Sequence, residues 1–89
     1  MKTVVSVIGK DAVGIIAKVS AVCSECNANI LDITQSVLQD MFVMVMLTEI
    51  SESNCSFSDF SNKLSILGKE NNLAIRAMHE DIFNSMHRI

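Results

Sequence analysis

The chain has 89 residues, of which 49% are apolar, and it carries a net charge of -3. This length predicts a single domain spanning residues 1–89. A chain this short buries only roughly 60 to 65% of its unfolded surface, so we expect a homodimer or larger assembly. The seven Lys and Arg residues provide neither a basic patch for direct nucleic-acid binding nor a cationic cluster for an anionic membrane.

The N-terminal residues do not resemble a targeting segment. After Lys2, a short apolar run leads to Lys10 and Asp11, which is too short for a signal peptide or a membrane span. We therefore expect a cytoplasmic protein. In that compartment the three cysteines, an odd number, are expected to be reduced thiols and not a disulfide framework.

The first two predicted elements are a strand and a helix. Residues 3–9 are mostly β-branched or apolar and end in glycine, which is typical of a central strand covered on both faces. From Ala12 to about Asn27, apolar residues recur at helical spacing and form one stripe. Asn27 is expected to end the helix, because asparagine tolerates the left-handed conformation. The stripe consists of Ile15, Ile16, Val19, Val22, Cys23 and Cys26.

The middle of the chain predicts two more strands. Residues 30–38 alternate imperfectly and include several polar residues, which indicates an edge strand. Residues 41–47 are apolar at both parities, so we expect this strand to be buried on both faces. One face of the strand meets the helices, and the other meets a partner subunit or the C-terminal segment. The pattern leaves open whether Phe42, Met44 and Met46 or Val43, Val45 and Leu47 face the helices.

The C-terminal half predicts a helix over residues 57–70, a strand over 73–79 and a short terminal helix from about residue 81. The resulting order is βαββαβ. Connection rules make this an α+β, ferredoxin-like fold, an antiparallel four-stranded sheet with two helices on one face and a short C-terminal helix. The strands over 3–9 and 41–47 are expected at the centre of the sheet.

The turn after the first strand is the candidate binding site. Gly9 permits a sharp turn, and Asp11 is a candidate N-cap for the helix that follows. The unpaired N–H groups of a helix start and the positive end of its dipole suit a carboxylate or another anion. Gly14 has no Cβ to keep a ligand or a neighbouring strand away. The alternative interpretation is a capped turn that binds nothing.

The same residues resemble a known family. The pattern G-x-D-x-x-G-I-I-A-x-V from Gly9, followed by Asn29-Ile30, is similar to the ACT domain, and most similar to short stand-alone ACT proteins related to regulators of glycine cleavage. Val13 stands where many ACT domains have proline. The resemblance implies a regulatory module that binds a small amino acid, such as glycine or serine, at a subunit interface, with a regulated protein as a further partner. It implies ligand contacts from Gly9, Lys10, Asp11, Ala12, Val13, Gly14 and Ile15, and from Asn29 and Ile30 of a neighbouring protomer.

Other functions find less support in the sequence. The C-x-x-C of Cys23 and Cys26 lies at the C-terminal end of its predicted helix, where cysteines pack as small apolar residues. Neither Cys55 nor the two histidines complete a zinc motif. No nucleophile and base are suitably spaced, so we predict a protein that is not an enzyme and has no metal or cofactor. The competing hypothesis is a ligand-free protein–protein interaction module that uses the apolar sheet face.

Overall fold

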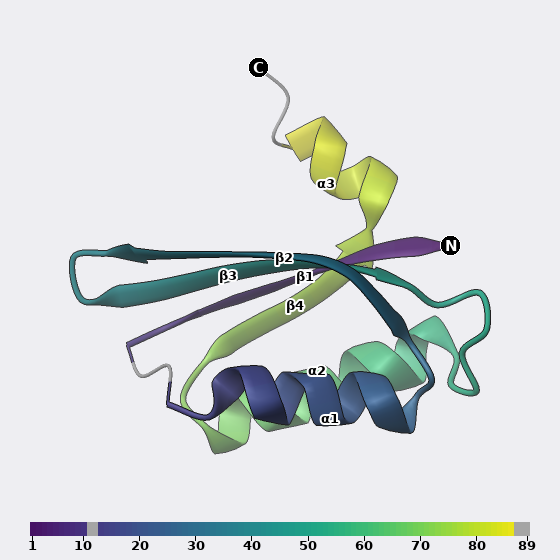
Figure 1. The fold of residues 1–89 in the computed structure, drawn as a ribbon, viewed down its shortest axis with the longest axis horizontal. Coiled ribbons are helices and arrows are strands. Elements are labelled where there is room, and N and C mark those ends of the chain that lie inside the picture. Colours follow the sequence, from purple (N-terminus) through teal and green to yellow (C-terminus); the bar gives the residue numbers. More distant parts are fainter. Residues whose placement is uncertain (11–12, 87–89) are drawn as a thin grey trace.

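The computed structural model describes residues 1–10 and 13–86. It confirms the βαββαβ order with a short helix at the C-terminal end (Figure 1). The predicted bounds agree with the observed ones to within a few residues, and the second helix agrees at both ends. The elements are β1 (Lys2–Gly9), α1 (Ile15–Glu25), β2 (Asn29–Leu38), β3 (Met41–Glu49), α2 (Phe57–Glu70), β4 (Ala74–His79) and α3 (Glu80–Met86).

The four strands form one sheet in the order β2-β3-β1-β4, and every neighbouring pair is antiparallel. This confirms that β1 and β3 are central and that β2 lies at an edge. Helices α1 and α2 cover one face of the sheet, whereas α3 stands on the opposite face (Figure 1). We call the first the covered face and the second the open face.

The hydrophobic core lies between the covered face and the two long helices. Phe42, Met44 and Met46 of β3 are buried in it, while Val43 and Val45 between them are only half-buried. This decides the alternative that the sequence left open for β3. The helices contribute to the same core through Ile15, Val19 and Cys23 of α1 and Phe60 and Leu64 of α2.

Helix α1 begins later than predicted. It starts at Ile15 and not at Ala12, because Gly14 is its N-cap and has a left-handed φ of 71°. Asp11 lies outside the described residues, as does the cap predicted for it. Ile16, which the helical stripe included, is 37% exposed, so the buried stripe is narrower than predicted. Asn27 has a φ of 55°, as expected of an asparagine that ends a helix.

The expectation of three reduced cysteines is wrong for one pair, since the structure joins Cys26 to Cys55 in a disulfide. The loop before α2 folds over the end of α1, where the Ser53 hydroxyl and the Asn54 N–H both donate to the Cys26 carbonyl, at 2.8 and 3.0 Å. The two Cα atoms are thereby 5.3 Å apart, which suits a disulfide. Cys23 stays a free, buried thiol, and burial raises its pKa.

Candidate ligand-binding site

The candidate turn joins β1 to α1 at one end of the sheet. Gly9, its first residue, does not have a positive φ; a Cβ at this position would instead clash with the side chain of Leu73. The absence of a Cβ at Gly9 thus lets the side chain of Leu73, the residue before β4, pack against the end of β1.

Gly14 serves the turn in a different way. Its φ of 71° lies in the left-handed region, which costs an L-residue with a side chain about 1 to 2 kcal/mol. Apart from Gly14 itself and the residues next to it in the chain, no described atom lies within 4 Å of the position where a Cβ would stand. The structure thus leaves open space beside Gly14, and no strand of the same chain approaches it closely.

The start of α1 carries backbone donors. The first helical bond runs from the Lys18 N–H to the Gly14 carbonyl at 3.0 Å, so the N–H groups of residues 15–17 precede the helical ladder. The first turn contains no acidic residue, and the Lys18 ammonium donates to the Asn71 side chain at 2.7 Å. The positive end of the helix is therefore not neutralised by its own first turn, and a carboxylate is stabilised at such a position.

The remaining predicted residues divide into two groups. Lys10 and Val13 are exposed beside the turn, and Val13 is 87% exposed. Ala12 lies outside the described residues. Asn29 is exposed and Ile30 half-buried, but both lie at the opposite end of the sheet.

The strand register places this second group. Asn29 pairs with Glu49 of β3, and Glu49 in turn pairs with Lys2 at the start of β1. Gly9, at the end of β1, pairs with Phe42 of β3, and Phe42 in turn pairs with Val37 near the end of β2. One chain therefore does not bring Asn29 and Ile30 to the turn, and only a second copy can supply them there.

Two residues that the sequence analysis did not single out lie at the turn's end of the sheet. Val37 and Leu38, at the tip of the β2-β3 hairpin, are 71% and 70% exposed. Adjacent exposed apolar residues on an edge strand indicate a contact surface. The signal available in the sequence was this apolar pair directly before Gln39 and Asp40, which form the turn between β2 and β3.

The opposite end of the sheet carries a cluster of polar groups at Glu49. The Met1 ammonium group donates to the Glu49 carboxylate at 2.7 Å, and the Ser51 hydroxyl and N–H donate to it at 2.6 and 3.0 Å. The hydrogen bond from the N-terminal ammonium group and those from Ser51 lower the pKa of Glu49 to about 2. Among the described residues, no group of His, Cys, Asp and Glu side chains is arranged to hold a metal ion. No helix within residues 1–10 and 13–86 is long and apolar enough to cross a membrane.

Comparisons with known proteins agree with this architecture. The ACT domain family matches residues 2–78. A UPF0237 protein of Clostridium acetobutylicum is 47% identical over the whole of both chains. An ACT domain protein from Streptococcus pneumoniae has the same fold, with a TM-score of 0.81 and 35% identity over 93% of each chain. A candidate glycine cleavage system transcriptional repressor has a TM-score of 0.72 at 21% identity, covering 89% of this chain and 47% of its own.

Proposed function

The chain belongs to the ACT domain family of regulatory ligand-binding modules, and on this premise we propose that residues 1–89 form a non-catalytic regulatory module in the cytoplasm. It binds a small amino acid, such as glycine or serine, between two protomers. The observation that carries the proposal is the start of α1. Its backbone donors and the positive end of its dipole face the β1-α1 connection, and the first turn of the helix contains no acidic residue. The ligand's carboxylate binds there.

The second half of the site comes from a second copy through β2. Edge strands present unpaired backbone groups that favour pairing with another chain. If β2 pairs antiparallel with its symmetry mate about Thr34, so that the two Thr34 residues are opposite each other, the register shift between Ile30 and Asp32 places Ile30 of one copy opposite Val37 of the other. This register moves the partner's Asn29 and Ile30 to the end of the sheet that carries the turn. Helix α1 packs beneath β2, whereas α2 packs beneath β4, so the start of α1 is on the side that the second copy approaches.

A panel of amino acids tests the proposal by thermal unfolding. A ligand present at 100 times its dissociation constant stabilises the native state by about 2.7 kcal/mol, which raises the Tm of so small a domain. We expect a shift of about 10 to 20 °C with one or more small amino acids. No shift with any amino acid, at concentrations up to about 10 mM, contradicts the proposal and favours the ligand-free interaction module.

A charge placed at the turn distinguishes this site from others. Val13→Asp adds a carboxylate beside the start of α1, which favours the helix dipole but competes with the ligand's carboxylate. We expect unchanged or slightly higher stability together with at least tenfold weaker amino-acid binding. Ser65→Asp, on an exposed position of α2, is the matched control and leaves binding unchanged. If both variants bind the amino acid equally well, the ligand site is not at this turn.

The intersubunit half is tested on β2. Thr34→Lys places two lysines close together in the antiparallel register, so we expect a shift from dimer to monomer in analytical ultracentrifugation. Amino-acid affinity falls with it, because each ligand loses contacts from the partner. A variant that is monomeric but binds with full affinity shows that one protomer holds the complete site, and Asn29 and Ile30 are then not ligand contacts.

A further inference from the structure

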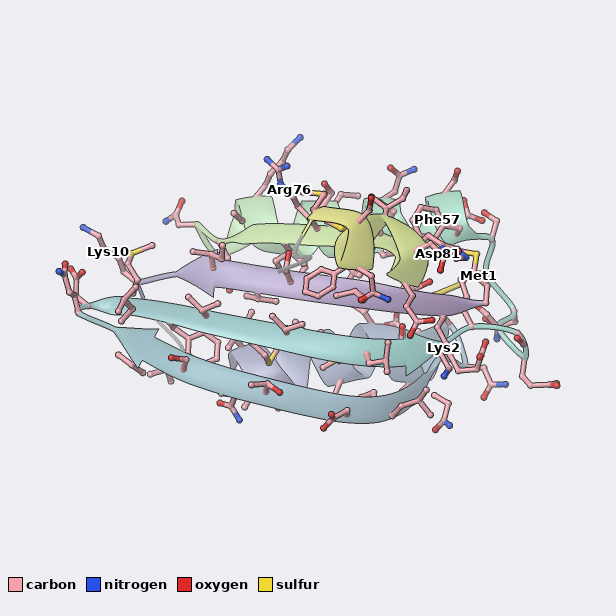
Figure 2. All side chains as sticks on the ribbon, turned by 90° about the horizontal axis from the view of Figure 1, so that it is seen from above. Met1, Lys2, Lys10, Phe57, Arg76 and Asp81 are labelled. Atoms are coloured by element: carbon pink, nitrogen blue, oxygen red, sulfur yellow. A yellow bond between two sulfur atoms is a disulfide. The ribbon has the colours of Figure 1, made fainter. Side chains whose placement is uncertain are left out.

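The open face of the sheet contains a groove that the proposed amino-acid site does not use. It has a volume of about 440 Å³, within the range of small-molecule sites. The sheet forms its floor and α3 forms one wall, and Figure 2 looks down on this face with α3 lying above β1 and β4. Its apolar lining comes from three strands and the helix, with Ile8, Val43, Val45, Met78, Phe83 and Met86 as its larger residues.

Two polar side chains also line the groove, and the register makes them neighbours. Ser6 of β1 lies directly opposite Arg76 of β4, so both side chains point to the open face from adjacent strands. Neither has a hydrogen bond or ion pair to another residue in the described part of the chain. Asp81 of α3 does not pair with Arg76. Its carboxylate is 3.6 Å from the His79 imidazole, and Figure 2 shows Asp81 and Arg76 near opposite ends of α3.

An apolar groove with a few convergent polar groups is the usual form of a ligand site. Here the polar groups are a guanidinium, which recognises carboxylates through two parallel N–H bonds, and a hydroxyl that donates a third. Arg76 is the charged residue of the lining. From this charge and apolar complementarity we propose that the open-face groove binds a small amphipathic carboxylate, with the carboxylate at Arg76 and Ser6 and the aliphatic body between β1, β3 and α3.

The packing of α3 is consistent with a site that admits a ligand. No residue of α3 is buried, and Met86, part of the wall, is 65% exposed. A ligand's hydrocarbon chain therefore covers apolar surface on both the sheet and the helix, which is favourable for each methylene buried. The groove lies on the opposite side of the sheet from the α1 turn, so the two sites are separate.

The test is a titration of the isotope-labelled full chain with straight-chain carboxylates, followed by amide NMR shifts. We expect shifts that centre on Ser6, Ile8 and Ala74, with octanoate binding more tightly than hexanoate by about fourfold for each added methylene. Octanamide, which has the same body without the charge, is expected to bind about 10 to 100 times more weakly.

Variants assign the head group and the body of the ligand separately. Arg76→Gln is expected to lower octanoate affinity about 10 to 100 times and to abolish the preference over octanamide. Lys69→Gln, on an exposed position of α2, is the control with an equal change of charge and leaves affinity unchanged. Ala74→Trp fills the groove from an exposed strand position and is expected to prevent binding. The amino-acid response is expected to survive Arg76→Gln, which keeps this test independent of the proposed function.

Three results overturn the proposal. The first is the absence of amide shifts with octanoate at concentrations above about 1 mM. The second is equal affinity for octanoate and octanamide, since the charge at Arg76 then recognises nothing. The third is that octanoate does not bind while Ala74→Trp converts a dimer to a monomer, because the groove is then occupied by a second copy of the chain.

Discussion

The covered face and the open face of the sheet differ although they share the same four strands. On β3, Met44 points to the covered face and is completely buried, whereas Val45, the next residue, points to the open face and is half-buried. Two long helices close the first face and one short helix stands on the second. Stability is therefore concentrated on one face, and the other has apolar surface left for binding.

The largest expected effect compares neighbouring residues of β3. Met44→Ala removes a side chain from the closed core and is expected to lower the free energy of unfolding by about 2 to 5 kcal/mol. Val45→Ala removes half-buried methyl groups and is expected to cost about 1 kcal/mol. Urea unfolding measures both. Equal costs would show that the open face is packed as tightly as the core and that stability is not concentrated on the covered face.

A smaller effect is expected where α2 packs on the sheet. A Cβ at Gly68 would lie 2.7 Å from the Leu73 carbonyl oxygen and 3.2 Å from Ile75 Cγ1. Gly68→Ala is therefore expected to destabilise the protein by about 1 to 3 kcal/mol, in spite of the better helix propensity of alanine.

Gly14→Ala is the control for that substitution, because the added Cβ contacts no distant residue and the variant loses about 1 to 2 kcal/mol through its left-handed φ alone. Thermal unfolding at one protein concentration compares the two variants. A stabilised Gly68→Ala protein would mean that α2 moves away from β4 without loss.

The covered face also contains a pair of buried threonines opposite each other on β1 and β3. The Thr48 hydroxyl donates to the Thr3 carbonyl at 2.9 Å, whereas the Thr3 hydroxyl has no partner within the described residues. Thr3→Val is expected to stabilise the protein by about 1 kcal/mol, because it removes an unsatisfied buried group. Thr48→Val is expected to destabilise it by a similar amount. Chemical denaturation distinguishes these opposite signs, and destabilisation by both variants indicates a partner for Thr3 in solution.

The smallest expected effect is the pH dependence that arises at Glu49. Its pKa of about 2 lies below the ordinary value of 4.5, so its ionised form favours the folded state. This contribution is complete above about pH 4.5 and is lost as the pH falls toward 2. Because the carboxylate is exposed, the effect is small and weakened by salt. Glu49→Gln is expected to flatten the stability curve between these pH values, and an unchanged curve contradicts the assignment.

Most of the fold was predictable because its elements have strong local patterns. The apolar run of β3 and the spacing of Phe60 and Leu64 in α2 each indicate one type of element. The late start of α1 was not predictable, because the left-handed backbone conformation of Gly14 depends on the whole turn and not on one residue type. The Cys26–Cys55 contact depends on how a distant loop folds over α1, which residue spacing does not contain.

The candidate site was predictable only in part. The glycines and the helix start in the sequence identify the turn. They do not show that Asn29 lies at the far end of the same sheet. The Ser6 and Arg76 pair was missed for a related reason. The two residues are neighbours only through the register of β1 with β4, and register between strands distant in sequence is set by the tertiary fold.

The exposed packing of α3 has a kinetic consequence. A helix without buried residues opens at a lower free energy than the core strands, so its amide hydrogens exchange with solvent without global unfolding. Exchange in β1 and β3, by contrast, requires the whole sheet to open. A molecule held between α3 and the sheet must leave before α3 detaches fully, or must move with it. A ligand that binds both α3 and the sheet is therefore expected to slow the exchange of residues 80–86, with little change in β1 and β3.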